Sequence, residues 1–105
     1  MDAQLKRGFI EICVLAALNR RDSYGYQIIE DMKACIEISE STLYPVLRRL
    51  EGSGLLESYS VEYNGRLRKY YRITPDGRKR LIEFNKEWNE MQRMYMFISE
   101  GRGDE

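Results

Sequence analysis

The strongest constraint on the fold is an Asn64-Gly65 pair set between two stretches in which apolar and polar residues alternate, LLESYSVEY and RLRKYYRIT. Asn-Gly in this setting is the characteristic signal of a two-residue type I′ hairpin turn. Such a turn fixes the strand register, so that the facing pairs are Tyr63 with Arg66, Val61 with Arg68, Tyr59 with Tyr70, and Glu57 with Arg72. The other face of the ribbon includes Leu56, Tyr71 and Ile73. We therefore expect the base of the hairpin to pack on a core and its tip to carry Arg66, Arg68 and Lys69.

Three stretches with helical periodicity precede the hairpin. Residues 9–18 are apolar almost all round, which indicates a helix buried on more than one side. In the second stretch, Asp22 or Ser23 is the expected N-cap, and the apolar residues at helical spacing are Ile29, Met32 and Ile36. In the third, one face is apolar and consists of Leu43, Val46, Leu47 and Leu50.

The polar face of the third helix comprises Ser41, Thr42, Tyr44, Pro45, Arg48 and Arg49. Because proline lacks an N–H, Pro45 indicates that the helix begins near Ser39 or Ser41, or is kinked at the proline. The glycines Gly52 and Gly54 end it. Hydroxyls, an aromatic ring and arginines near a helix N-terminus suit contact with phosphates and base edges. A surface helix with ordinary solvated arginines is the alternative.

Three helices followed by a basic hairpin are typical of a winged helix-turn-helix, in which one helix enters the major groove and the hairpin, or wing, reaches the nearby backbone. We therefore predict an α+β fold, mostly α, with residues 1–74 as a winged-helix DNA-binding domain. A hairpin that only completes the fold is the alternative. The formal net charge is zero, yet residues 41–80 hold nine basic and four acidic side chains, so the positive charge falls on the third helix and the wing.

A fourth helix is expected over residues 75–100, with Thr74 as N-cap and Pro75 in the first position. Apolar residues recur there in two heptad series offset by three, a pattern typical of helix pairing. This seam could lie on the first helix of the same chain, but that helix is itself apolar on several sides. We therefore predict a homodimer, as part of the same compact unit, whose interface comprises Phe9, Cys13, Leu81, Phe84, Trp88, Met91, Tyr95 and Ile98. Residues 101–105 are expected to form a disordered tail.

Three segments of the chain together resemble the PadR family of transcriptional regulators. They are SYGYQI in the second helix, STLYPVLRRLEGSGLLES in the third helix and its exit, and GRLRKYYRITPDGRKRL from the wing to the fourth helix. The resemblance implies a winged-helix repressor that dimerises through its C-terminal helix. By position, the DNA-facing residues would be Thr42, Tyr44, Arg48, Arg49, Arg66, Arg68 and Lys69, to which the polar face adds Ser41. Leu67 departs from the family pattern, because many relatives have proline at this position in the wing.

The length of the chain resembles a short branch of that family with a single C-terminal helix. In some members of this branch, tryptophans of both subunits line a central pore that holds flat aromatic compounds, and Trp88 occupies a similar place. The predicted effector pocket for a planar hydrophobic molecule comprises Phe9, Phe84, Trp88, Met91 and Tyr95. Ordinary dimer packing is the alternative for these residues.

The leading interpretation is therefore a ligand-responsive repressor that binds a pseudo-palindromic operator in double-stranded DNA as a homodimer. A winged helix used only for protein-protein contact is the alternative. An enzyme is not expected, and neither is a cofactor or a metal, because the chain has no histidine, no cysteines at metal-binding spacing and no glycine-rich phosphate loop.

The remaining expectations concern the setting of the protein. Residues 9–18 are too few to span a membrane and include Glu11, so we expect a cytoplasmic protein without membrane contact. The two cysteines, Cys13 and Cys35, are each set among apolar residues and are expected to be reduced core thiols. A regulatory thiol is the other interpretation.

Overall fold

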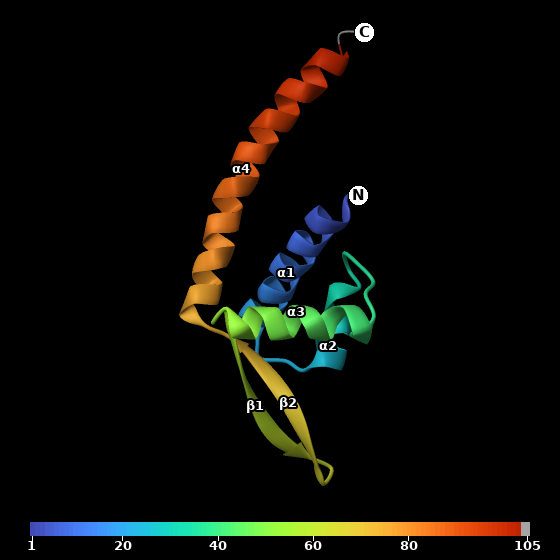
Figure 1. The fold of residues 1–105 in the computed structure, drawn as a ribbon, viewed down its shortest axis with the longest axis vertical. Coiled ribbons are helices and arrows are strands. Elements are labelled where there is room, and N and C mark those ends of the chain that lie inside the picture. The colour runs from blue at the N-terminus through green and yellow to red at the C-terminus, as the bar shows by residue number, and fades with distance from the viewer. Residues whose placement is uncertain (104–105) are drawn as a thin grey trace.

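The computed structural model describes residues 1–103, in which three helices are followed by a two-stranded antiparallel hairpin and one long helix (Figure 1). The elements are α1 (Ala3–Arg20), α2 (Gly25–Met32), α3 (Glu40–Gly52), β1 (Leu56–Tyr63), β2 (Arg66–Ile73) and α4 (Pro75–Gly103). Helices α1 to α3 form a cluster, the hairpin projects from one end of it, and α4 projects from the other. The molecule is accordingly elongated, 64 × 26 × 20 Å. The prediction of a winged helix-turn-helix with a long C-terminal helix is confirmed.

The core lies where α1, α2, α3 and the base of the hairpin meet. Its fully buried members include Val14 and Leu15 of α1, Ile28 of α2, and Leu43 and Leu47 of α3. The spacing predicted the buried residues of α1 and α3, but for α2 it predicted Ile29, Met32 and Ile36 and missed Ile28. Burying such side chains contributes about 1.5 to 3 kcal/mol each. None of the described helices is long and apolar enough to cross a membrane.

Helix α2 is shorter than the sequence indicated. It begins at Gly25 after Tyr24, and neither Asp22 nor Ser23 caps it. The predicted N-cap was wrong because Ser23 forms an isolated β-bridge with Tyr71 of β2, in which the backbone of each residue both donates and accepts a hydrogen bond. The loop before α2 is therefore attached to the wing.

Helix α2 also ends at Met32, so Ile36 and Cys35 follow it. Ile36 is half-buried against the core from this connecting segment. The expectation that both cysteines are core thiols was wrong for Cys35, which is exposed, whereas Cys13 on α1 is half-buried.

Helix α3 has the limits that its proline and glycines predicted. The Ser39 side chain accepts a hydrogen bond from Thr42 N, so Ser39 is the N-cap and Pro45 is the sixth helical residue. At the other end, Leu55 N donates to Leu50 O and Gly54 N donates to Glu51 O. This is a Schellman motif, and it requires the positive φ of 77° that Gly54 adopts without strain.

The hairpin has the predicted register throughout, from Tyr63 opposite Arg66 to Leu56 opposite Ile73. Asn64 and Gly65 both have positive φ, as a type I′ turn requires. Leu56, Tyr71 and Ile73 are buried as expected, so the base of the wing belongs to the core.

Thr74 joins the wing to α4 at a tight corner. Its hydroxyl accepts a hydrogen bond from Gly77 N and donates one to Gly54 O, and its backbone N–H donates to Leu55 O. A side chain at Gly77 would collide with Leu55 O and with Ile73, so glycine allows α4 to start directly against the base of the wing. The helix continues to Gly103, and residues 104–105 of the expected tail lie outside the described residues.

Candidate nucleic-acid interface

The exposed face of α3 presents the polar residues that were predicted to meet DNA. Ser41, Thr42, Tyr44 and Arg48 are all exposed, while the opposite face of the helix is buried. The hydroxyl oxygens of Ser41 and Thr42 lie 2.9 and 3.3 Å from Ser39 Oγ, so the hydroxyls gather around the start of the helix. Together with the backbone N–H groups of the first turn, this end of α3 can donate hydrogen bonds outward.

Tyr44 lies against the start of α2. A Cβ atom at Gly25 would be 2.6 Å from the Tyr44 hydroxyl, so the glycine makes room for this ring. Between the start of α2, α3 and the wing there is a shallow pocket of about 310 Å³, lined by Tyr24, Gly25, Tyr26, Glu40, Tyr44, Arg68, Lys69 and Tyr71. Sequence reasoning missed the α2 residues of this surface, although a glycine inside SYGYQI was a signal of close approach.

The neighbouring arginines of α3 differ in their contacts. Arg49 Nε donates a hydrogen bond to Glu11 Oε1 of α1 over 2.6 Å, in a salt bridge that joins the two helices. Arg48 has no such acidic partner among the described residues. Both arginines of α3 were predicted to contact DNA, and Arg48 is the one whose guanidinium is available to another molecule.

Arg68 of the wing is enclosed by aromatic rings. Its guanidinium carbon lies 4.0 Å from the centroid of Tyr24 and 3.9 Å from that of Tyr63. Tyr70 packs edge-on against Tyr24 and stacks on Tyr59, with centroid distances of 5.4 and 5.7 Å. A hydrogen bond with Tyr70 raises the pKa of Arg68 further above its ordinary value. Arg68, which was predicted to contact DNA, thus also connects the wing to Tyr24 at the start of α2.

The tip of the wing itself carries Arg66 and Leu67. Arg66 is exposed, and Leu67, which stands where proline was expected from the family pattern, is 76% exposed. Lys69 points to the other face of the ribbon, where its Nζ lies 3.9 Å from a carboxylate oxygen of Glu51 at the end of α3. This is a loose pair, so Lys69 remains partly free to contact an anion.

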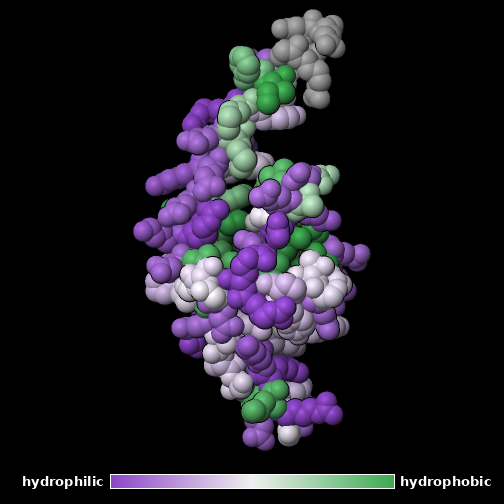
Figure 2. Space-filling model, in the orientation of Figure 1, coloured by the Kyte–Doolittle hydropathy of each residue, from purple (hydrophilic) through white to green (hydrophobic). Residues whose placement is uncertain are grey.

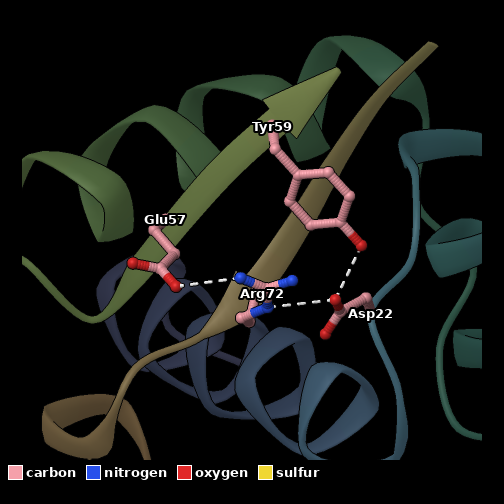
Figure 3. Close-up of polar contacts among 4 residues, drawn as sticks. All are labelled: Asp22, Glu57, Tyr59 and Arg72. Carbon is pink, nitrogen blue, oxygen red and sulfur yellow. Dashed lines mark hydrogen bonds and ion pairs between the residues drawn. The ribbon is translucent and has the colours of Figure 1, made fainter. Parts of the chain in front are cut away.

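A four-residue polar network fixes the base of the wing (Figure 3). Asp22 Oδ2 accepts hydrogen bonds from the Tyr59 hydroxyl over 2.6 Å and from Arg72 Nε over 3.1 Å, and Arg72 Nη1 lies 3.4 Å from Glu57. The hydrogen bond to Asp22 raises the pKa of Tyr59. The hairpin register predicted that Glu57 faces Arg72, but the role of Asp22 was missed because it depends on a contact between distant segments.

The predicted effector residues lie where α1 and α4 pack together. Phe9 makes edge-on contacts with Phe84 and Trp88, at centroid distances of 5.8 and 6.2 Å. An apolar pocket of about 540 Å³ is lined by Met1, Leu5, Phe9, Trp88, Met91, Gln92 and Tyr95. It contains four of the five predicted residues, while Phe84 lines an adjoining pocket beside Phe9. Leu5 was missed, although it is one helical turn before Phe9.

The heptad seam of α4 is divided between two environments. Leu81, Phe84 and Met91 are half-buried, and Leu81 packs against the core cluster. Trp88, Tyr95 and Ile98 are exposed, at 41, 59 and 67%. Figure 2 shows apolar side chains gathered toward the C-terminal part of α4. Cys13, which was predicted in the same interface, is half-buried on α1 and packs against the core cluster.

Residues 14–83 match the family model described as "Transcriptional regulator PadR-like family". Transcriptional regulator Rv3488 of Mycobacterium tuberculosis (strain ATCC 25618 / H37Rv) is 32% identical over 91 residues, which cover 86% of this chain and 85% of that protein. The X-ray structure of a PadR-like transcription factor from "bacteroid fragilis" superposes with a TM-score of 0.83 at 35% identity, over 91% of this chain and 95% of the other. The crystal structure of smu.1704 from Streptococcus mutans UA159 has a TM-score of 0.75 at 45% identity, over 89 and 88% of the two chains.

Proposed function

The chain belongs to the PadR-like family of transcriptional regulators, and we propose that it is a repressor that binds a two-fold operator as a homodimer. Membership implies DNA binding and transcription regulation rather than catalysis. The observation that carries the proposal is the open polar face at the start of α3, beside a wing whose tip presents Arg66. In a winged helix-turn-helix, such a helix enters the major groove while the wing meets the flanking backbone.

We assign the base contacts to α3. Arg48 has no acidic partner in the described chain, and its guanidinium can donate two hydrogen bonds to the O6 and N7 atoms of guanine. Ser41 and Thr42 supply short hydroxyls to phosphates or base edges at the start of the helix. Tyr44 extends this surface toward α2.

We assign the phosphate contacts to the wing. Arg66 at the tip and Lys69 on the flank are both exposed cations, so both can neutralise phosphates. Arg66 would lose no internal ion pair on binding, whereas Lys69 would give up its loose pair with Glu51. Arg49 and Arg68 can add to the positive field, but each is held by Glu11 or by tyrosine rings in the free protein. In the free protein, Arg49 joins α3 to α1, and Arg68 joins the wing to the start of α2.

We propose that two copies pair through the seam of α4. Trp88, Tyr95 and Ile98 are large and exposed, although heptad positions of this kind are normally buried in a helix pair. A two-fold dimer would then present two α3 helices and two wings to one face of a duplex. Half-sites should be separated by about one or two helical turns of DNA.

Selection of duplexes from a random pool by the purified protein tests this function. The expected product is an imperfect palindrome, bound with an affinity that falls steeply as salt rises. An asymmetric site would contradict the two-fold dimer. Recovery of no preferred site, with little dependence of binding on salt, would instead favour a winged helix used for protein-protein contact.

We further propose that the pocket between α1 and α4 takes a planar hydrophobic effector. Its wall combines Phe9, Trp88 and Tyr95 with the flexible Met91, and aromatic pairs contribute about 0.5 to 1.5 kcal/mol beyond area burial. A guest that fits one spacing of the two α4 helices best would shift the distance between recognition helices.

Trp88 is the only tryptophan, so its fluorescence reports on this pocket. Planar aromatic compounds at tens of micromolar are expected to quench the emission and to change operator affinity. If both stay constant over such a panel, Trp88 serves in packing alone. The matched variant Trp88→Phe keeps an aromatic ring and identifies signals that do not come from the pocket.

A further inference from the structure

Three consecutive residues between α1 and α2 contact the wing, each in a different way. The Asp22 carboxylate accepts hydrogen bonds from two side chains at the base of the wing (Figure 3). The backbone of Ser23 exchanges two hydrogen bonds with that of Tyr71, over 3.1 and 2.7 Å. The ring of Tyr24 reaches further along the hairpin and lies against the guanidinium of Arg68. The three contacts therefore follow one another along β2, from its base toward its tip.

The distal half of the wing, residues 61–68, depends on the last of these contacts. The guanidinium carbon of Arg68 lies 4.0 Å from the ring centroid of Tyr24 and 3.9 Å from that of Tyr63. Within residues 1–103, no hydrogen bond or salt bridge joins residues 61–68 to a residue outside the hairpin. A two-stranded hairpin is at best marginally stable by itself in water. The stack of Tyr24, Arg68 and Tyr63 is therefore the contact that can hold this half in place.

Tyr24 is itself held by its neighbours in the sequence. Ser23 on one side is 2% exposed and paired with β2. The carbonyl oxygen of Tyr24 accepts a hydrogen bond from Ile28 N over 2.9 Å, as the N-cap of α2. Gly25 on the other side is buried, and a Cβ atom there would be 2.6 Å from the hydroxyl of Tyr44 on α3. Two adjacent residues thus contact the wing and the helix that carries the predicted base contacts.

The stack ends beside the tip of the wing. Tyr63 is the last residue of β1 and pairs with Arg66, the first residue of β2, across the two-residue turn. The position of Tyr63 therefore sets the position of the Arg66 backbone. When α3 occupies a major groove, the distance from α3 to the tip decides which phosphate Arg66 can reach.

We propose that Tyr24 is a positioning residue, which through Arg68 and Tyr63 keeps the wing tip at the distance from α3 at which Arg66 meets the DNA backbone. This role rests on the proposed function, because it concerns the same wing and the same phosphates. The attraction between a guanidinium and the face of a tyrosine ring supplies the link. The ring of Tyr24 is needed for it, and the hydroxyl is not.

The test compares Tyr24→Leu with Tyr24→Phe in the full-length protein, titrated with a mixed-sequence DNA duplex at several salt concentrations. Phenylalanine keeps a ring face for Arg68, whereas leucine does not. Tyr24→Leu should lower the slope of log affinity against log salt by roughly one for each wing, and Tyr24→Phe should match the wild type. In the free protein, Tyr24→Leu should speed the amide exchange of residues 61–68 about two- to fivefold, and Tyr24→Phe should not.

Arg68→Met breaks the same stack from the other side, so the test does not depend on the folding of one variant. It should speed the exchange of residues 61–68 by itself, and adding Tyr24→Leu to it should cause no further change. Additive effects of the two substitutions would overturn the proposal.

The DNA titrations have two further outcomes that would contradict the role of Tyr24. Equal weakening by Tyr24→Phe and Tyr24→Leu would mean that the hydroxyl contacts DNA directly. Tighter binding by Tyr24→Leu would mean that the stack withholds Arg68 from DNA. A wild type without salt-dependent binding would instead refute the proposed function, while the exchange measurement would still decide whether Tyr24 holds the wing.

Discussion

The winged unit, residues 1–74, and the distal part of α4, residues 92–100, differ in how far their side chains find partners within the chain. In the winged unit, several charged groups find partners within the chain, such as Arg49 with Glu11 and Arg72 with Asp22. On distal α4, large apolar side chains are open to solvent, and Phe97 is 80% exposed. The first region contains the apolar core, which a single chain supplies. The second becomes energetically reasonable only when another surface covers it, because exposed apolar patches of this kind mark interaction sites.

The largest effect is expected when charge is placed on the exposed heptad positions of distal α4, Tyr95 and Ile98. Tyr95→Glu with Ile98→Glu should weaken dimerisation at least a hundredfold, since an unpaired carboxylate in an apolar interface costs several kcal/mol. Sedimentation equilibrium at micromolar concentration measures this. The winged unit should keep its circular dichroism.

Met96→Glu is the matched control for the seam. Met96 is also exposed on distal α4, but it lies outside the two heptad series. It should leave the dimer largely intact. If Met96→Glu dissociates the protein as strongly as the seam variant, the heptad assignment of the interface is wrong.

The next largest effect is expected within the winged unit, where Arg48 of α3 has no acidic partner among the described residues, unlike Arg49. Arg48→Ala should cost about 1 to 3 kcal/mol of operator binding and should change the preferred base at one position of each half-site. Arg49→Ala should act mainly on stability, by up to about 1 kcal/mol, because it removes the exposed pair with Glu11. Fluorescence anisotropy and urea unfolding separate the two. Equal losses of base preference would contradict the distinction.

The wing offers a comparison of the same kind. Arg66→Ala should weaken binding to all duplexes about equally and should lower the slope of log affinity against log salt by roughly one. Arg68→Ala removes the cation that Tyr24 and Tyr63 enclose, so it should also loosen the wing. Faster amide exchange in β1 and β2 of the free protein would reveal this. Unchanged exchange would mean that the tyrosines hold the wing without Arg68.

The smallest effect concerns a hydroxyl that the winged unit leaves unsatisfied. Ser23 is 2% exposed, and its Oγ has no hydrogen-bond partner among the described residues. Ser23→Ala should therefore change the free energy of unfolding by only a few tenths of a kcal/mol, in the stabilising direction. Ser58→Ala is the control, since its Oγ donates to Glu51 over 2.6 Å and its loss should cost about 1 kcal/mol. A large loss from Ser23→Ala would indicate a partner that the chain alone lacks.

Patterns confined to neighbouring residues predicted most of the fold. Asn64-Gly65 specified the wing and its register, and Gly54 the end of α3. The heptads specified a long fourth helix, which extends three residues beyond the predicted end at residue 100. The errors arose where distant segments meet. The pairing of Ser23 with Tyr71 displaced the start of α2, and nothing near Arg49 in the sequence indicates Glu11, 38 positions away. The sequence accordingly indicated which face of α3 is exposed, but not which of its arginines has an acidic partner.

The corner formed by Gly54, Thr74 and Gly77 has a mechanical consequence. Here the exit of α3, the end of β2 and the start of α4 are joined by short contacts. A rotation of α4 about this corner would therefore change its angle to the winged unit. A helix of 29 residues is about 43 Å long, so a rotation of about 5° at this corner displaces its far end by about 4 Å. In the proposed dimer, a rotation of a few degrees at this corner would thus change the distance between the two wings by about the spacing of one base pair.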